Sequence, residues 1–207
     1  MAFFDFLKKK ELKNIVLNYM LNSKDSITKN EEINKPNNID YYLNNKIGYF
    51  TQAKTKENAI YISRLVAKFY IKSLTKKEFT KLVLDLIPDY DDELLFNERE
   101  NFILMAKQYD TWQNIQSTKD LFPYLKYSAI VEISCPVCKK LDNVIRHADD
   151  PFWDIYYPPN CPECRCIVQQ YEKNEINKPT DLTKIKLKLP IEEFAINVGK
   201  HELKSLY

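Results

Sequence analysis

The cysteines are the residues of this sequence whose type and spacing most clearly indicate a chemical role. Cys135 and Cys138 form one C-x2-C pair, Cys161 and Cys164 form a second, and Cys166 follows two residues later. Each pair can turn tightly enough to direct two thiolates inward, and four thiolates are the soft ligands that Zn²⁺ prefers in a closed tetrahedral site. The pattern therefore predicts a structural zinc site whose ligands are Cys135, Cys138, Cys161 and Cys164.

Disulfide bonds or ordinary unbonded thiols would also account for these cysteines, and the spacing alone leaves both alternatives open. Two disulfides would require an oxidising compartment, whereas unbonded thiols would require no special environment. The short apolar stretch at residues 1–7 precedes the basic residues 8–10 and has no small-residue cleavage site. A secretory signal has the opposite order, with its positive charge first. We therefore expect no signal peptide and prefer the metal site.

Cys166 and His147 are the candidates for an alternative metal ligand. Cys166 is left over when the two pairs supply four thiolates, so it is interpreted as an alternative ligand, a packed thiol or a site of exchange. His147 lies between the two pairs. Because four thiolates already fill a tetrahedron, we interpret His147 as a polar loop residue.

The sequence gives little sign of catalysis. An all-thiolate site is typical of structural zinc, whereas a hydrolytic zinc needs a position open to water and usually has histidine or carboxylate ligands. The acidic cluster at residues 89–93 suits the N-terminus of a helix. Only two glycines occur, Gly48 and Gly199, which excludes glycine-rich phosphate-binding loops. We expect a protein that is not an enzyme.

Composition is typical of a globular protein. Its 207 residues are 44% hydrophobic and 13% aromatic, enough for a core in one domain plus a small module. The net charge of +2 argues against a protein that coats nucleic acid, so any DNA contact is expected to be local. No apolar run approaches the roughly 18–20 residues that cross a bilayer, so we expect a soluble protein without membrane partners.

Helical patterns dominate the first 125 residues. Thr75 and Glu78 form a capping box for a helix that Pro88 stops. The polar residues 23–38 are interpreted as a linker or loop with a short helix. Apolar side chains recur at three- and four-residue steps, as on one face of a helix, in three further stretches: 3–22, 57–74 and 95–117.

The pattern changes near Lys126. Residues 127–134 alternate and are rich in β-branched types, which predicts a strand that leads directly into Cys135. Ile167 and Val168 predict a second strand, and the alternation of lysine with aliphatic residues at 184–189 predicts a half-exposed third. The expected fold class is α+β, in three parts: a mainly α-helical domain at 1–125, a small four-cysteine zinc-binding β module at 126–172, and a C-terminal tail with a short strand at 173–207.

Short motifs accompany the cysteines: Leu141-Asp142 after the first pair, Trp153 and the run Pro158-Pro159-Asn160 before the second, and Cys164-Arg165-Cys166 at the end. Together they resemble the phage Mu F-like minor head protein family, also called phage head morphogenesis proteins. Residues 194–200 are similar to the Phe-x-x-Asn-x-Gly stretch that often follows in that family. The resemblance covers roughly residues 134–200 and includes nothing from the helical half.

The chain departs from the family pattern at two positions. Many members have His or Gly where this chain has Cys161, and Pro is common where it has Val198. Cysteine and histidine both occur in structural zinc sites, so the metal prediction is unchanged. Either Cys161 or Cys166 completes the set with Cys164, and we favour Cys161 because two equivalent turns give the more regular geometry.

The resemblance implies a virion protein present in few copies, associated with the portal vertex and acting in head assembly, head-tail connection or DNA passage. Its partners would be the portal or other virion proteins, copies of itself in a connector ring, and packaged DNA. It would be assembled into the virion in the host cytoplasm. The residues leave open an alternative from another class, a nucleic-acid-binding zinc-ribbon protein that acts in the host cytoplasm.

Arg165, Trp153 and Tyr157 are candidate contact residues for nucleic acid or a partner. An arginine between two cysteines could bind phosphate, or equally a carbonyl or carboxylate group. The aromatic rings could stack on bases, although in a module with few aliphatic residues we rather expect them to form the core. The lysine clusters at residues 8–13 and 184–188 are interpreted as solvated faces.

Overall fold

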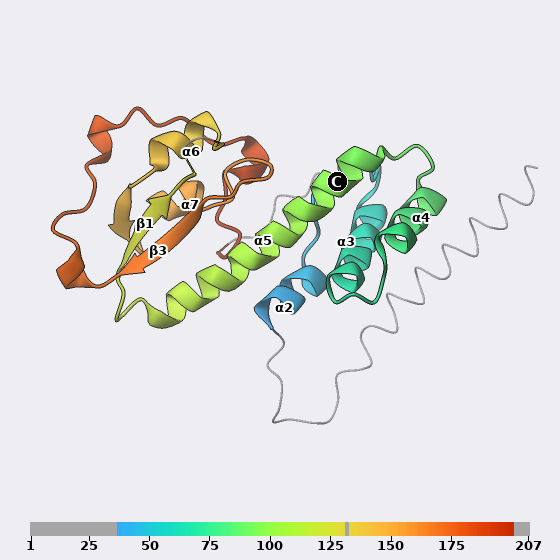
Figure 1. Cartoon of the computed structure of the whole chain (residues 1–207), viewed down its shortest axis with the longest axis horizontal. Helices are drawn as coiled ribbons and strands as arrows, with labels where there is room; N and C mark the ends of the chain where they lie inside the picture. Colours follow the sequence, from blue (N-terminus) through green and yellow to red (C-terminus); the bar gives the residue numbers. More distant parts are fainter. Residues whose placement is uncertain (1–36, 131–132, 201–207) are drawn as a thin grey trace, which may run out of the picture. The chain divides into compact units, whose positions relative to one another are not determined.

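The computed structural model describes residues 37–130 and 133–200, which are coloured in Figure 1. The predicted helix at 3–22 and most of the polar linker lie outside this range. The elements follow in this order: α2 (Asn38–Asn45), α3 (Lys56–Tyr70), α4 (Lys76–Leu86), α5 (Asp92–Thr118), β1 (Tyr124–Ser128), α6 (Pro136–Leu141), β2 (Ile145–His147), α7 (Phe152–Tyr156), β3 (Ile167–Tyr171), and the short 3-10 helices η1 (Lys173–Glu175), η2 (Leu182–Lys184) and η3 (Glu192–Phe194).

Local capping groups set the starts of the long helices. The Thr75 hydroxyl accepts from the Glu78 backbone N–H at 3.3 Å, and the Glu78 carboxylate accepts from the Thr75 N–H at 2.8 Å. This confirms the predicted capping box of α4, which ends before Pro88. Asp91 caps α5 by accepting from the Leu94 N–H at 2.7 Å, which explains the acidic residues at this position. Within the described ranges, no helix is both long and apolar enough to cross a bilayer.

A first hydrophobic cluster lies among helices α2 to α5. Helix α2 contacts both α3 and α5, and it was not predicted from the sequence. Its start is capped by Asn37, and its Tyr42 and Leu43 are buried. The apolar stripe predicted on α5 is also buried, so it forms core: Leu95, Phe102 and Met105 lie in this first cluster, and Trp112 lies in a second.

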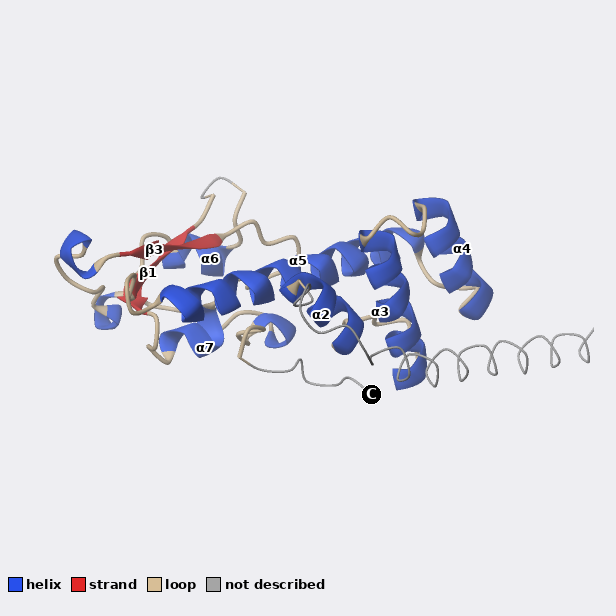
Figure 2. Cartoon of the chain, turned by 90° about the horizontal axis from the view of Figure 1, so that it is seen from below, coloured by secondary structure: helices blue, strands red, loops and turns tan. Residues whose placement is uncertain are grey.

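The sheet is small and antiparallel, with the strand order β2-β1-β3. It is drawn in red beside the blue helices in Figure 2. Tyr124 of β1 pairs with His147 on one side and Tyr171 on the other. The predicted strand at Ile167 and Val168 is confirmed as the start of β3. Helices and antiparallel strands together make the fold α+β, as predicted.

The strand predicted at 127–134 was correct only at its first two residues, and the strand predicted in the tail was wrong. Strand β1 covers Tyr124–Ser128, and its pairing ends at the partners Ser128 and Ile167, so it does not lead directly into Cys135. Residues 184–189 form no strand. Hydrogen bonds between backbone groups there stay within the tail, such as that from the Leu187 N–H to the Ile185 carbonyl at 3.0 Å. Ile185 and Leu187 instead pack against the second cluster, which accounts for the alternation without a sheet.

The second hydrophobic cluster lies beneath the sheet and the cysteine turns. It contains the β1 residues Leu125 and Tyr127, three of the cysteines, and Trp112 and Ile115 from the C-terminal half of α5. Helix α5 therefore contributes to both clusters. The residues that surround the cysteines are thus fixed to the longest helix of the described chain.

Candidate metal centre

The first cysteine turn opens helix α6. Cys135 is the N-cap residue: its Sγ accepts from the Cys138 backbone N–H at 3.5 Å, and its carbonyl accepts from the Lys139 N–H at 3.0 Å. Pro136 occupies the first helical turn, where its missing N–H costs nothing. This tight turn brings the Cys135 and Cys138 sulfurs to 3.4 Å from each other.

The second cysteine turn is closed by its own backbone and held by helix α5. The Cys164 N–H donates to the Cys161 carbonyl at 3.3 Å, and Glu163 between them has a positive φ of 54°. The Glu163 N–H donates to Asn101 Oδ1 at 2.9 Å, across 62 residues of sequence. The second pair is therefore positioned by the helical part of the chain as well as by its own turn.

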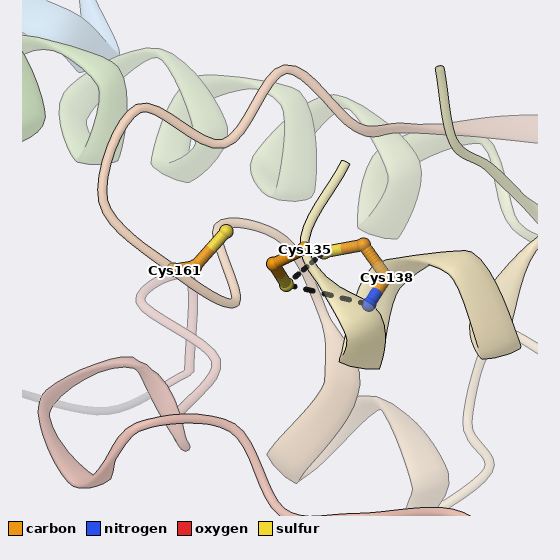
Figure 3. A group of neighbouring side chains, drawn as sticks. All are labelled: Cys135, Cys138 and Cys161. Carbon is orange, nitrogen blue, oxygen red and sulfur yellow. Dashed lines mark hydrogen bonds between the residues drawn. The ribbon is translucent and has the colours of Figure 1, made fainter. Parts of the chain in front are cut away.

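All five cysteines come together in two overlapping groups. Cys135, Cys138 and Cys161 have their sulfurs within 4.8 Å of one another, and so do Cys138, Cys164 and Cys166. Figure 3 shows the first group, with Cys161 coming from a separate loop. The Cys138 and Cys164 sulfurs are 3.8 Å apart. Zn–S bonds of about 2.3 Å in a tetrahedron place sulfurs about 3.8 Å apart, so this spacing fits such a metal.

The four predicted ligands are divided between these two groups, which share Cys138, so their binding of one ion together stays a prediction. Zn²⁺ there would supply a cross-link between the two turns and no open position for water if all four thiolates bind. Cys166 is also near, as the sequence left open. It is buried, and its Sγ lies 3.5 Å from Ser134 Oγ. The cluster therefore holds one thiol more than a tetrahedron uses.

Contacts among the thiols shift the pKa values of Cys138 and Cys164 in opposite directions. Hydrogen bonds with Cys161, Cys164 and Cys166, followed by burial, raise the pKa of Cys138. Hydrogen bonds from Cys138, Cys161 and Cys166 lower the pKa of Cys164, and a backbone hydrogen bond from Asn160 adds to this. Closely spaced thiols cannot all ionise without a cation among them. A divalent metal that binds thiolates would remove this conflict and release protons.

The motifs around the cysteines have structural roles. Leu141 is fully buried in the second cluster, and Asp142 Oδ1 accepts from the Ala129 N–H at 2.9 Å, which ties the first turn to the end of β1. Tyr127 was not predicted as a site residue, yet its phenol donates to Cys138 Sγ at 3.3 Å. Its position in a predicted strand gave no sign of this contact, because the contact depends on the fold.

His147 does not join the cysteines, so its prediction as an alternative ligand was wrong. It ends the edge strand β2, with its ring against Tyr124 at 5.6 Å between centroids. Its Nδ1 accepts from the Asp149 N–H at 3.2 Å. Neither of the two groups of close thiols in the described chain includes it. The interpretation as a polar loop residue was closer, since the side chain is about half exposed.

Trp153 and Tyr157 are core residues, so their prediction as contact residues was wrong. Both have 0% exposure, which leaves no ring face for a base or a partner. The Trp153 indole N–H donates to the His147 carbonyl at 2.9 Å, and Tyr157 packs edge-on against Trp112 at 4.8 Å. The core interpretation of these rings is therefore correct.

Arg165 is exposed beside the cysteines. It lines a cavity of about 400 Å³ together with Ile133, Glu163 and the five cysteines. The guanidinium is thus available to solvent at the mouth of the site. Its role in contacting phosphate or a partner stays a prediction.

The tail returns to helix α5. Phe194 and Val198 are buried in the first cluster, and Asn197 Oδ1 accepts from the Gly199 N–H at 2.9 Å. The Gly199 carbonyl accepts from Gln113 Nε2 on α5 at 3.0 Å. The spacing of the Phe-x-x-Asn-x-Gly stretch therefore serves to fold this segment against the long helix.

Comparison with known proteins supports the resemblance that the motifs indicated. Residues 70–169 match the family model described as "Phage Mu protein F like protein". The chain is also 37% identical over 59 residues to "Putative capsid assembly protein F" of Escherichia phage Mu, a stretch that is 28% of this chain and 13% of that protein. No solved structure matches the chain. The resemblance to the Mu F-like head morphogenesis family is thereby confirmed.

The range of the match adds to what the motifs suggested. It starts at residue 70, so it includes helices α4 and α5, which lie outside the resemblance that the motifs indicated. It ends at residue 169, ahead of the tail stretch 194–200. The family pattern therefore contains the α5 residues that hold the cysteine turns, together with the turns themselves. The chain covers 13% of the length of its phage Mu relative.

Proposed function

We propose that this protein is a non-enzymatic virion protein that acts in phage head assembly at the portal vertex, and that a structural Zn²⁺ holds its cysteine turns together. The match of residues 70–169 to the Mu F-like family carries the proposal. The name of the phage Mu relative refers to capsid assembly, which favours a role in the head. The resemblance further favours the portal, other virion proteins or copies of this chain as partners.

The cysteine geometry supports a structural role for the metal. Three buried members of the second cluster are cysteines, and the two cysteine turns have little regular structure beyond the short helix α6. A zinc ion bound by four thiolates contributes about 10–16 kcal/mol to small modules of this kind, enough to decide whether they fold. The ion would therefore fix the surface around the turns rather than perform a reaction.

Helix α5 physically connects the other helices to the cysteine turns. It contributes buried residues to both hydrophobic clusters, and its Asn101 holds the second turn. A protein that docks on one virion component through its helices would thereby hold the cysteine surface in a fixed relation to that component. This arrangement suits a connector at the portal vertex, including one built of several copies.

The test uses the phage that encodes the chain. Purified heads and complete virions would be analysed for the protein by quantitative mass spectrometry, and a phage lacking it would be examined by electron microscopy. We expect a few copies per particle, and heads that are misassembled or empty in its absence. The proposal would be overturned if the phage that lacks the protein formed normal heads and if the protein were absent from purified particles of the unchanged phage.

The alternative of a nucleic-acid-binding zinc ribbon makes a different prediction. It requires affinity of the isolated chain for DNA or RNA that falls steeply as salt rises. The burial of Trp153 and Tyr157 removes the predicted stacking surface and leaves Arg165 as the candidate contact. Two results together would favour this alternative. The first is salt-sensitive binding that Arg165→Ala abolishes, and the second is the absence of the protein from purified particles.

A further inference from the structure

Tyr127 connects the sheet to the cysteine at the centre of the cluster. It lies in β1, its side chain is fully buried, and its phenol O–H donates to Cys138 Sγ at 3.3 Å. Cys138 is the thiol that belongs to both close groups. The hydrogen bond therefore reaches the one sulfur that the two close groups have in common.

Asn160 fixes the direction of that hydrogen bond. Its Nδ2 donates to the Tyr127 Oη at 3.0 Å and to the Tyr156 carbonyl at 3.0 Å. The Tyr156 carbonyl is only an acceptor, so it requires the NH2 side of the amide to face both groups. Since Tyr127 Oη accepts from Asn160, the phenol hydrogen is left to point at Cys138 Sγ. Asn160 is itself buried and directly precedes Cys161.

We propose that Tyr127 and Asn160 are positioning residues of the metal centre, forming a relay in which the Asn160 amide orients the Tyr127 phenol and the phenol donates to the Cys138 thiolate. The inference depends on the structural zinc site proposed above. A donor to a metal-bound thiolate draws electron density from the sulfur and holds the ligand in one orientation. The relay also joins the two turns, because Tyr127 contacts the first pair and Asn160 precedes the second.

The test compares two tyrosines of the same cluster. Tyr127→Phe removes the phenol that touches Cys138. Tyr157→Phe is the matched control, since Tyr157 is equally buried and its phenol donates to the Gln108 carbonyl at 3.2 Å, away from the cysteines. Both changes remove one oxygen and add no volume, so both variants should keep the far-UV circular dichroism of the full-length protein. Zn²⁺ affinity would be measured by competition with a chromophoric chelator, and Co²⁺ would be used as a spectroscopic probe.

Tyr127→Phe should weaken Zn²⁺ binding about 10- to 100-fold, the usual effect of losing a hydrogen-bond partner of a metal ligand. It should also move the sulfur-to-cobalt charge-transfer band to longer wavelength, because a sulfur without its donor gives up an electron more easily. Tyr157→Phe should leave the Zn²⁺ affinity and the cobalt charge-transfer band unchanged. An unchanged affinity and band in Tyr127→Phe, or equal changes in Tyr157→Phe, would overturn the inference.

A second variant tests the relay itself. Asn160→Ala removes the group that orients the phenol, so it should shift the cobalt band in the same direction as Tyr127→Phe. Combined with Tyr127→Phe it should add no further shift, because the two residues act in series. Additive shifts would contradict the relay. If the unchanged protein binds neither Zn²⁺ nor Co²⁺, the metal centre itself is overturned, which separates the two failures.

Discussion

Asn101 on helix α5 accepts a hydrogen bond at 2.9 Å from the backbone N–H of Glu163, inside the second cysteine turn. Glu163 has a positive φ, a conformation that L-residues adopt only when their surroundings support it. A side chain of the helical half thus stabilises the backbone between two candidate metal ligands. The connection makes the cysteine site sensitive to changes in a helix that carries none of its ligands.

Asn101→Ala should therefore weaken metal binding although it leaves every cysteine in place. Losing one hydrogen bond to a backbone group costs about 1 kcal/mol, close to a fivefold loss of affinity. Chelator competition would measure it. Asn97→Ala on the same helix is the matched control and should have no effect on affinity. Equal affinity in Asn101→Ala and the unchanged protein would show that the second cysteine turn keeps its conformation without Asn101.

Removal of the metal should unfold the cysteine turns before the helices. A strong chelator added to the purified protein should increase hydrogen exchange in β1, α6 and β3, while α3 and α4 stay protected, because their cluster contains no cysteine. Hydrogen exchange with mass spectrometry gives this resolution. Metal analysis that finds no zinc, with five freely titrating thiols, would remove the basis for this prediction.

Serine variants should separate the four ligands from the fifth cysteine. Cys138→Ser should abolish stoichiometric binding, because Cys138 belongs to both close groups. Cys166→Ser should retain one Zn²⁺ per chain if Cys135, Cys138, Cys161 and Cys164 are the ligands. The measurement is metal content after gel filtration. Retention in Cys161→Ser and loss in Cys166→Ser would assign the fourth position to Cys166 instead.

Gly199→Ala should destabilise the docking of the tail on α5. A Cβ at this position would lie 2.3 Å from Cβ and Cγ of Trp112, so the backbone or the indole would have to move. Overpacking of this kind costs about 1–3 kcal/mol. Chemical denaturation would measure the loss, with the exposed Lys188→Ala in the same tail as a control. A variant as stable as the unchanged protein would show that the tail is not held at this contact.

Local sequence signals predicted the local structure well. The capping box at Thr75 and the acidic N-terminus of α5 were recognisable because caps involve residues three positions apart. The cysteine spacing likewise indicated two tight turns. The strand predicted for the tail failed because alternation reports only which side chains are buried, and Ile185 and Leu187 are packed without a neighbouring strand.

By itself, the sequence determined the starts of α4 and α5, the two cysteine turns and the resemblance to phage head proteins, since each depends on residues close together in the chain. Only the tertiary structure decided that Cys166 joins the thiols while His147 does not, that Trp153 and Tyr157 are core, and that Tyr127 touches Cys138. These relations depend on the register of β1 with β3 and on the packing of α5 against the module. Spacing within one segment carries no information about such long-range contacts.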